Sequence, residues 1–149
     1  MATFFRIVQA RWASSAMDGE GARLYGGRWN SPGMPAVYLA ESRALAALEI
    51  VVHAPREVLG LDWSLLEVEV PDKLIERVPS LPKHWQSMPW SIAARKHGDA
   101  WLQRGGLALS LPSVVIPEET VLLVNPRSRD YGKLKVSRPS VFRFDGRMA

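Results

Sequence analysis

The chain has 149 residues, of which 47% are hydrophobic and 23% charged, so we expect a single domain spanning residues 1–149. It contains no cysteine and only three scattered histidines, which excludes disulfides and thiolate metal sites, so no metal is expected. No N-terminal signal pattern and no membrane-length apolar segment is present, which favours a cytoplasmic protein, and the net charge of +4 suits an anionic substrate or partner.

In the first third of the chain, apolar segments are separated by a segment rich in glycine and proline. FFRIVQA at 4–10 predicts a strand, and the segment 17–35, with five glycines and two prolines, predicts a long structured loop with one short extended piece at 22–25. AVYLA at 36–40 predicts a short buried strand. Ser42 is then a plausible N-cap for a helix over 43–53, which Pro55 ends.

The remaining segments complete the expected architecture. In LLEVEV at 65–70, apolar and acidic residues alternate, which predicts a strand with one solvent-exposed face. Two short helices are expected at 89–96 and 99–104. Further strands are expected within 107–116, 121–125 and 140–144. Strands from both ends of the chain around a few short helices indicate an α+β fold with a mostly antiparallel sheet.

Glu49 is the one acidic residue in an otherwise apolar helix. Ala44, Ala46, Ile50 and their neighbours leave this helix with almost no polar face, so we expect it to be buried. A buried carboxylate is costly unless it is paired or opens into a polar cavity. The residues leave two interpretations open. Glu49 has a structural role, in a salt bridge to Arg28 or Arg43 or at a chance solvent gap, or its carboxylate faces a ligand.

The stretch GGRWN at 26–30 is equipped to bind an anion. Gly27 allows close approach of the backbone, Trp29 can form an aromatic wall and Asn30 can donate hydrogen bonds. Arg28 carries a planar guanidinium that can bind phosphate or carboxylate through two hydrogen bonds. Taken alone, the arginine also fits a purely structural role.

Tyr38 and Ser113 are polar residues within apolar strands. Tyr38 is either a core aromatic with its hydroxyl at the edge or a stacking surface for a flat ring. The Ser113 hydroxyl either bonds to the backbone or faces a ligand. Ser113 lacks a G-x-S-x-G setting and a nearby histidine in the sequence, so we do not expect a serine nucleophile.

The basic segment 125–138 supports a hypothesis of another class, a nucleic-acid-binding module without catalysis. It contains five cations and one acid, and the chain has six tryptophans that could stack on bases. The tryptophans, however, are not interleaved with a basic stripe. A solvated loop and core tryptophans account for the same pattern.

Seven motifs in order give the chain a resemblance to a known family. They are GGRWN, AVYLAES, ALEIVVHA, GDAWL, LPSVVIP, LLVNP and FRFDGR, and together they look like the RES domain, the toxin half of Xre–RES toxin–antitoxin pairs of bacteria. The match runs from about residue 6 to residue 147. One departure is Arg127, where the family tends to have a histidine after Asn-Pro.

The resemblance implies a fold similar to ADP-ribosyltransferases, with a split, mostly antiparallel sheet, and a toxin that cleaves NAD by hydrolysis or phosphorolysis or transfers ADP-ribose to a protein. The family's essential residues map onto Arg28, Tyr38 and Glu49, which we expect to be catalytic. Ser113 maps onto an active-site serine, and Asn30 and Gly27 are expected to contribute to substrate binding beside it.

The resemblance also implies partners. They are an Xre-type helix-turn-helix antitoxin protein and NAD as substrate, with inorganic phosphate or a protein as a further acceptor. No membrane partner and no direct nucleic-acid binding by the toxin alone are expected.

Overall fold

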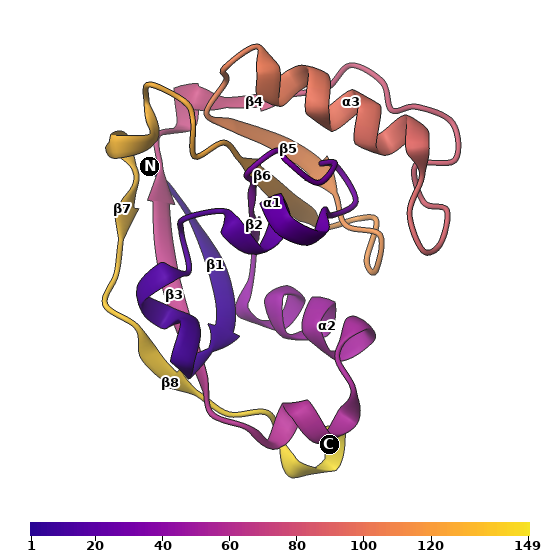
Figure 1. Cartoon of the computed structure of the whole chain (residues 1–149). Helices are drawn as coiled ribbons and strands as arrows, with labels where there is room; N and C mark the ends of the chain where they lie inside the picture. The colour runs from indigo at the N-terminus through magenta and orange to yellow at the C-terminus, as the bar shows by residue number, and fades with distance from the viewer.

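The computed structural model describes all 149 residues, which form an eight-stranded sheet and three α-helices joined by short 3-10 turns (Figure 1). The strands are β1 (Ala2–Gln9), β2 (Val37–Ala40), β3 (Trp63–Val70), β4 (Ile75–Arg77), β5 (Ala108–Pro112), β6 (Thr120–Val124), β7 (Lys135–Val136) and β8 (Ser140–Phe142). The helices are α1 (Glu20–Tyr25), α2 (Arg43–His53) and α3 (Ile92–Gln103). None of these helices is long and apolar enough to cross a membrane.

The sheet has the strand order β4-β5-β6-β2-β1-β3-β7, and β8 pairs with β3 beside β7. All pairs are antiparallel except β4 with β5. β1 pairs with β3 along its whole length, whereas it meets β2 through a single residue pair, Phe5 with Ala40. The predicted α+β class with a split, mostly antiparallel sheet is therefore confirmed.

Helices α2 and α3 cover the same face of the sheet. Leu45 and Ala46 of α2 pack in one buried cluster with Ala40, and α3 packs in another with Tyr38 beside it. Because Tyr38 and Ala40 are two positions apart on β2, they point to one face. The two helices thus flank the split between β1 and β2 from that side (Figure 1).

Helix α2 forms as the sequence predicts, with the same bounds. The Ser42 hydroxyl accepts a hydrogen bond from the Leu45 backbone N–H at 3.0 Å, which satisfies one of the free donors of the first turn. The expectation that this helix is buried nearly all round is wrong. Only Leu45 and Ala46 are buried, and Val52 is exposed, because the helix borders an open cavity rather than a second layer.

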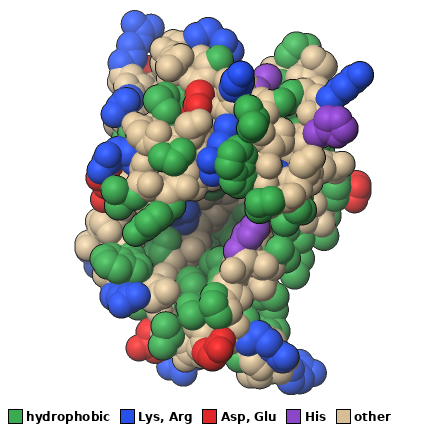
Figure 2. Space-filling model, turned by 45° about the vertical axis from the view of Figure 1, so that its right-hand side comes forward, with side chains coloured by type: hydrophobic (Ala, Val, Ile, Leu, Met, Phe, Trp, Pro, Cys, Tyr) green, Lys and Arg blue, Asp and Glu red, His purple; other side chains and the backbone are tan.

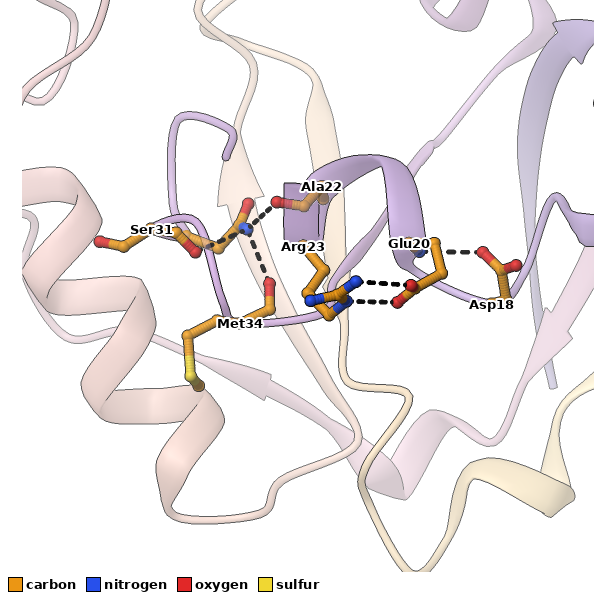
Figure 3. Close-up of polar contacts among 7 residues, drawn as sticks. Asp18, Glu20, Ala22, Arg23, Ser31 and Met34 are labelled. Carbon is orange, nitrogen blue, oxygen red and sulfur yellow. Dashed lines mark hydrogen bonds and ion pairs between the residues drawn. The ribbon is translucent and has the colours of Figure 1, made fainter. Parts of the chain in front are cut away.

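The glycine-rich loop contains a helix where we expected an extended piece at 22–25. Helix α1 begins at Glu20, whose backbone N–H donates to the Asp18 side chain at 2.9 Å. Gly19, the residue before the helix, adopts a left-handed φ of 75°. Arg23 and Glu20, three positions apart, form two hydrogen bonds along the helix (Figure 3). Local side-chain contacts therefore favour a helix here, although the high glycine content of the segment predicts a loop.

Helix α3 replaces the two short helices expected at 89–96 and 99–104. It begins after Ser91, whose hydroxyl accepts the Ala94 backbone N–H at 3.1 Å, and continues through Gly98. Gly98 falls in the gap between the two helices expected from the sequence. In the structure it is buried within the helix at a point of close contact with the backbone of Trp29.

Candidate active site

A cavity of about 650 Å³ lies at the split in the sheet, on the face that carries α2 and α3. Figure 2 shows the hollow on the surface, with hydrophobic side chains around its opening. This volume falls within the ~300–1,000 Å³ typical of small-molecule sites. The walls come from β1, β2, α2, the start of α3 and the segments 26–29, 88–90 and 112–115. Strands and helices from distant parts of the sequence thus converge on one site.

Glu49 lies in the cavity wall and is held by Ser113. The Ser113 hydroxyl donates to Glu49 Oε1 at 2.7 Å and accepts the backbone N–H groups of Val115 and Ile116 at 3.0 and 3.1 Å. Ser113 is buried and lies just beyond the end of β5, whereas the Glu49 side chain is 29% exposed. The serine is thereby fixed by the backbone and fixes one carboxylate oxygen in turn.

The second oxygen of Glu49 faces His53, one helical turn further along α2. The distance from Glu49 Oε2 to His53 Nε2 is 3.9 Å, and both residues line the cavity. Neither of the arginine salt bridges considered from the sequence forms, since Arg43 pairs with Glu67 and Glu49 makes no ion pair with Arg28. Glu49 therefore keeps its charge available to a ligand.

Tyr38 lines the cavity, and its hydroxyl is anchored by two hydrogen bonds. It donates to Asn30 Oδ1 at 2.6 Å and accepts the Trp29 backbone N–H at 3.1 Å. Burial raises the pKa of Tyr38, so the hydroxyl stays protonated and can donate. Gly27 lies against it, and a Cβ there would come within 2.7 Å of the Tyr38 hydroxyl oxygen. The glycine is needed for close packing on this ring.

Asn30 does not line the cavity. It is completely buried, and its side-chain amide donates to the carbonyl oxygens of Ala22 and Met34, both at 2.9 Å (Figure 3). With its oxygen bonded to Tyr38, the side chain cross-links the glycine-rich loop. Of the six predicted site residues, the cavity wall includes Gly27, Arg28, Tyr38, Glu49 and Ser113, whereas Asn30 lies behind them.

Arg28 lines the cavity and contacts the connection between β4 and α3. Its NH1 group donates to the carbonyl oxygens of Trp85 and Ser87 at 2.9 and 2.7 Å. Its NH2 group, on the exposed side, makes two longer contacts of 3.2 Å to Pro89 O and Met88 Sδ. Partial burial lowers the pKa of Arg28, and the nearby Glu49 charge opposes this effect.

Helix α3 holds the segment that carries Arg28. Arg95 Nε donates to the Gly27 carbonyl oxygen at 2.9 Å, and Asp99 Oδ1 accepts the Ser31 backbone N–H at 2.8 Å. Between these two residues, Gly98 allows the helix to lie directly on the backbone of Trp29. Three positions on one face of α3 thus fix the loop on both sides of Arg28.

Arg6 is a cavity residue that the sequence analysis missed. It extends from β1 into the split, where Nε donates to Ala16 O at 2.8 Å and NH1 donates to Tyr38 O at 3.1 Å. Burial lowers the pKa of Arg6, and the guanidinium forms no ion pair. A lone arginine inside the apolar run FFRIV was the signal that could have identified it.

Two further observations bear on the expectations from composition. The structure gathers no three His, Asp or Glu side chains in a position to hold a metal ion. No residue of the basic segment 125–138 lines the cavity.

The fold and the cavity define an α+β protein with a cavity at a split in its sheet, lined by a serine-held carboxylate and several arginines. The chain belongs to the RES domain family, whose model matches residues 3–145. The resemblance found in the sequence motifs is thereby confirmed.

Individual relatives match most of the chain. It is 40% identical over 154 residues to the Prs ADP-ribosylating toxin of Sphingobium sp., covering 98% of this chain and 96% of the relative. It is 35% identical over 132 residues to Toxin Res of Photorhabdus laumondii, covering 87% of this chain and 85% of that protein.

A solved structure has the same fold. The crystal structure of the Mycobacterium tuberculosis MbcT–MbcA toxin–antitoxin complex matches with a TM-score of 0.78 and 24% identity, covering 95% of this chain and 84% of the matched chain. MbcT, named an NAD(+) phosphorylase, is also 53% identical to this chain over 36 residues, which are 24% of this chain and 19% of MbcT.

Proposed function

We propose that this protein is the toxin of a toxin–antitoxin pair and cleaves NAD at the bond between nicotinamide and ribose. Membership of the RES family and the names of its relatives, an ADP-ribosylating toxin and an NAD(+) phosphorylase, support this function. The observation that carries the proposal is the Glu49 carboxylate, held by Ser113 and unpaired with any arginine, in a cavity lined by Arg28 and Tyr38.

The chemistry requires a carboxylate near the sugar. When the bond from ribose C1′ to the nicotinamide nitrogen breaks, its electron pair leaves with nicotinamide and the ribose becomes an oxocarbenium-like cation. A fixed negative charge beside that cation stabilises the transition state more than the ground state. Glu49 supplies the charge and holds the ribose 2′-hydroxyl, and Ser113 keeps the carboxylate in place.

The other cavity residues position the dinucleotide. Tyr38 packs its ring on nicotinamide, while its hydroxyl remains bonded to the loop. Arg28 binds the diphosphate through its NH2 group, exchanging the long contacts to Pro89 O and Met88 Sδ for phosphate oxygens. The NH1 group keeps its shorter bonds to the 85–87 segment. Gly27 lets the backbone approach the ligand, and Asn30 supports the loop.

Three acceptors are compatible with this site. Water gives ADP-ribose and phosphate gives ADP-ribose 1″-phosphate, and both outcomes deplete NAD. The 40% identical relative named an ADP-ribosylating toxin favours a second candidate function, transfer of ADP-ribose to a protein. NAD is the substrate in every case, and the cytoplasm is the compartment that fits such a toxin.

The test is release of nicotinamide from NAD by the purified chain, with and without phosphate. We expect Glu49→Gln, which keeps the shape of the side chain and removes its charge, to lower turnover by at least ~100-fold. Glu57→Gln is the matched control, because Glu57 is exposed and lies outside the cavity. A Glu49→Gln variant that turns over NAD at near the normal rate refutes the assignment of this residue.

A toxin that empties the NAD pool needs a restraint, and the match to a solved toxin–antitoxin complex supports a protein partner. We expect a helical, Xre-type antitoxin that covers the cavity and places an acidic side chain or its own terminal carboxylate near Arg28. The co-expressed complex should then release no nicotinamide. A complex that cleaves NAD as fast as the free toxin contradicts this mode of inhibition.

A further inference from the structure

An exposed tryptophan lies at the edge of the cavity, next to Arg28. Trp90 lines the cavity together with Met88 and Pro89, and 41% of its surface remains exposed. Trp29, Trp63 and Trp101, in contrast, are buried in the core. A large aromatic ring that faces both a cavity and solvent is available for contact with a ligand.

One face of the Trp90 ring is covered by Arg95. The Arg95 guanidinium lies over it with 3.7 Å between its central carbon and the ring centroid, and Arg95 is itself bonded to the Gly27 carbonyl oxygen at 2.9 Å. The preceding segment is fixed by the bonds from Arg28 NH1 to Trp85 O and Ser87 O. A ring fixed on one face loses little further freedom when a flat ligand stacks on the other.

The position of Arg28 relates Trp90 to the rest of the cavity. Its NH2 group is 3.2 Å from the carbonyl oxygen of Pro89, the residue before Trp90. Glu49 lines the same cavity. Arg28 therefore shares the cavity with the carboxylate and lies next to the segment that carries the tryptophan. In a dinucleotide, the diphosphate separates the nicotinamide riboside from the adenosine.

We propose that Trp90 is the stacking platform for the adenine ring of the substrate, with Arg95 as the residue that positions it. The identity of the ligand rests on the proposed function, whereas the platform itself rests on the Trp90 contacts. When the diphosphate binds Arg28 and the reacting ribose binds Glu49, the adenosine half extends toward residues 88–90. Met88 supplies an adaptable apolar contact beside the ring.

The experiment measures binding and does not need catalysis. Calorimetry with ADP-ribose, which contains adenine, and with nicotinamide mononucleotide, which lacks it, is carried out on wild type, Trp90→Ala and Trp90→Phe. Trp12→Ala is the matched control, because Trp12 is also exposed and also carries an arginine over its ring, Arg11 at 5.0 Å, but lies outside the cavity.

We expect Trp90→Ala to weaken ADP-ribose binding by about ten- to a hundredfold, the range of one base stacked on an aromatic side chain. Affinity for nicotinamide mononucleotide should change less than about threefold, which also shows that the variant is folded. Trp90→Phe, which keeps an aromatic face, should retain most of the ADP-ribose affinity, and Trp12→Ala all of it.

Each contrary outcome has one meaning. ADP-ribose affinity that is unchanged in Trp90→Ala, or lost equally for both ligands, overturns the platform. A wild-type chain that binds ADP-ribose through Trp90 and yet releases no nicotinamide from NAD, with or without a protein acceptor, supports the platform and refutes the proposed reaction.

Discussion

Gly98→Ala is the substitution that tests most directly how α3 positions Arg28. A Cβ at residue 98 would be 1.7 Å from the carbonyl oxygen of Trp29 and 2.6 Å from its carbonyl carbon. The obstructing atoms are backbone, so no change of rotamer relieves the contact. The helix and the loop must separate by more than an ångström, which also strains the bonds from Arg95 to Gly27 and from Ser31 to Asp99.

The expected loss of stability follows from two opposing effects. Overpacking in a close-packed interior costs ~1–3 kcal/mol and sometimes more, and a backbone contact belongs at the upper end. Replacing a helical glycine by alanine returns up to ~1 kcal/mol of helix propensity. We therefore expect a net loss of ~2 kcal/mol, which in a chain of this length lowers Tm by about 4–8 °C.

The expected loss of activity is separate from the loss of stability. Displacing a catalytic loop by about 1 Å can cost on the order of 100-fold in rate. Nicotinamide release should therefore fall by at least ~10-fold when it is measured well below the Tm of the variant. Thermal unfolding followed by circular dichroism gives the first quantity, and a nicotinamide assay at low temperature gives the second.

Gly21→Ala is the matched control. Gly21 is also a helical glycine, in α1, but nothing lies within 4 Å of a Cβ at this position. The same chemical change should leave Tm unchanged or raise it slightly, because only the propensity effect remains. If Gly98→Ala has the Tm and turnover of wild type, α3 does not fix the Arg28 loop in the way described.

Two further predictions concern the hydroxyl groups of the site. Ser113→Ala removes a hydrogen bond to the Glu49 carboxylate, worth ~1.5–3 kcal/mol for a charged partner, so kcat should fall ~10- to 100-fold. A kcat within threefold of wild type would mean that the serine does not hold Glu49. Tyr38→Phe keeps the ring but leaves Asn30 Oδ1 and the Trp29 N–H without a partner, which should lower stability by ~1–3 kcal/mol. Its turnover at low temperature should stay within tenfold of wild type, and the reverse result, normal Tm with lost turnover, would assign the chemistry to the hydroxyl.

The parts of the fold that local rules determine could be predicted from the sequence. The Ser42 cap, the apolar run after it and Pro55 set the bounds of α2, and six of the eight strands were found as runs of apolar or alternating residues, whereas the short strands β4 and β7 were not. The family motifs placed Glu49, Arg28 and Tyr38 at one site. Five of the six predicted residues do line a common cavity.

The rest depends on contacts between distant segments. Gly98 resembles a helix break in the sequence, and only the backbone of Trp29 lying against it explains why the glycine is inside a helix. Asn30 looks like a free donor in a loop, but Ala22, Met34 and Tyr38 use its bonding groups. Trp90 and Arg95 could not be assigned to the site from the sequence, because only the folded chain places them in contact with each other at the cavity.

The charges around the cavity explain why these residues are arranged as they are. Three arginines, Arg6, Arg28 and Arg95, line it together with a single carboxylate, Glu49, which favours an anionic ligand. Had Glu49 formed a salt bridge with Arg28, each charge would have neutralised the other, and neither could act on a substrate. The neutral hydroxyl of Ser113 orients the carboxylate instead and leaves its charge intact. In the proposed reaction the arginines would bind phosphate while Glu49 would stabilise a positive ribose, so the separation of charge in the site would match that in an NAD molecule as its glycosidic bond breaks.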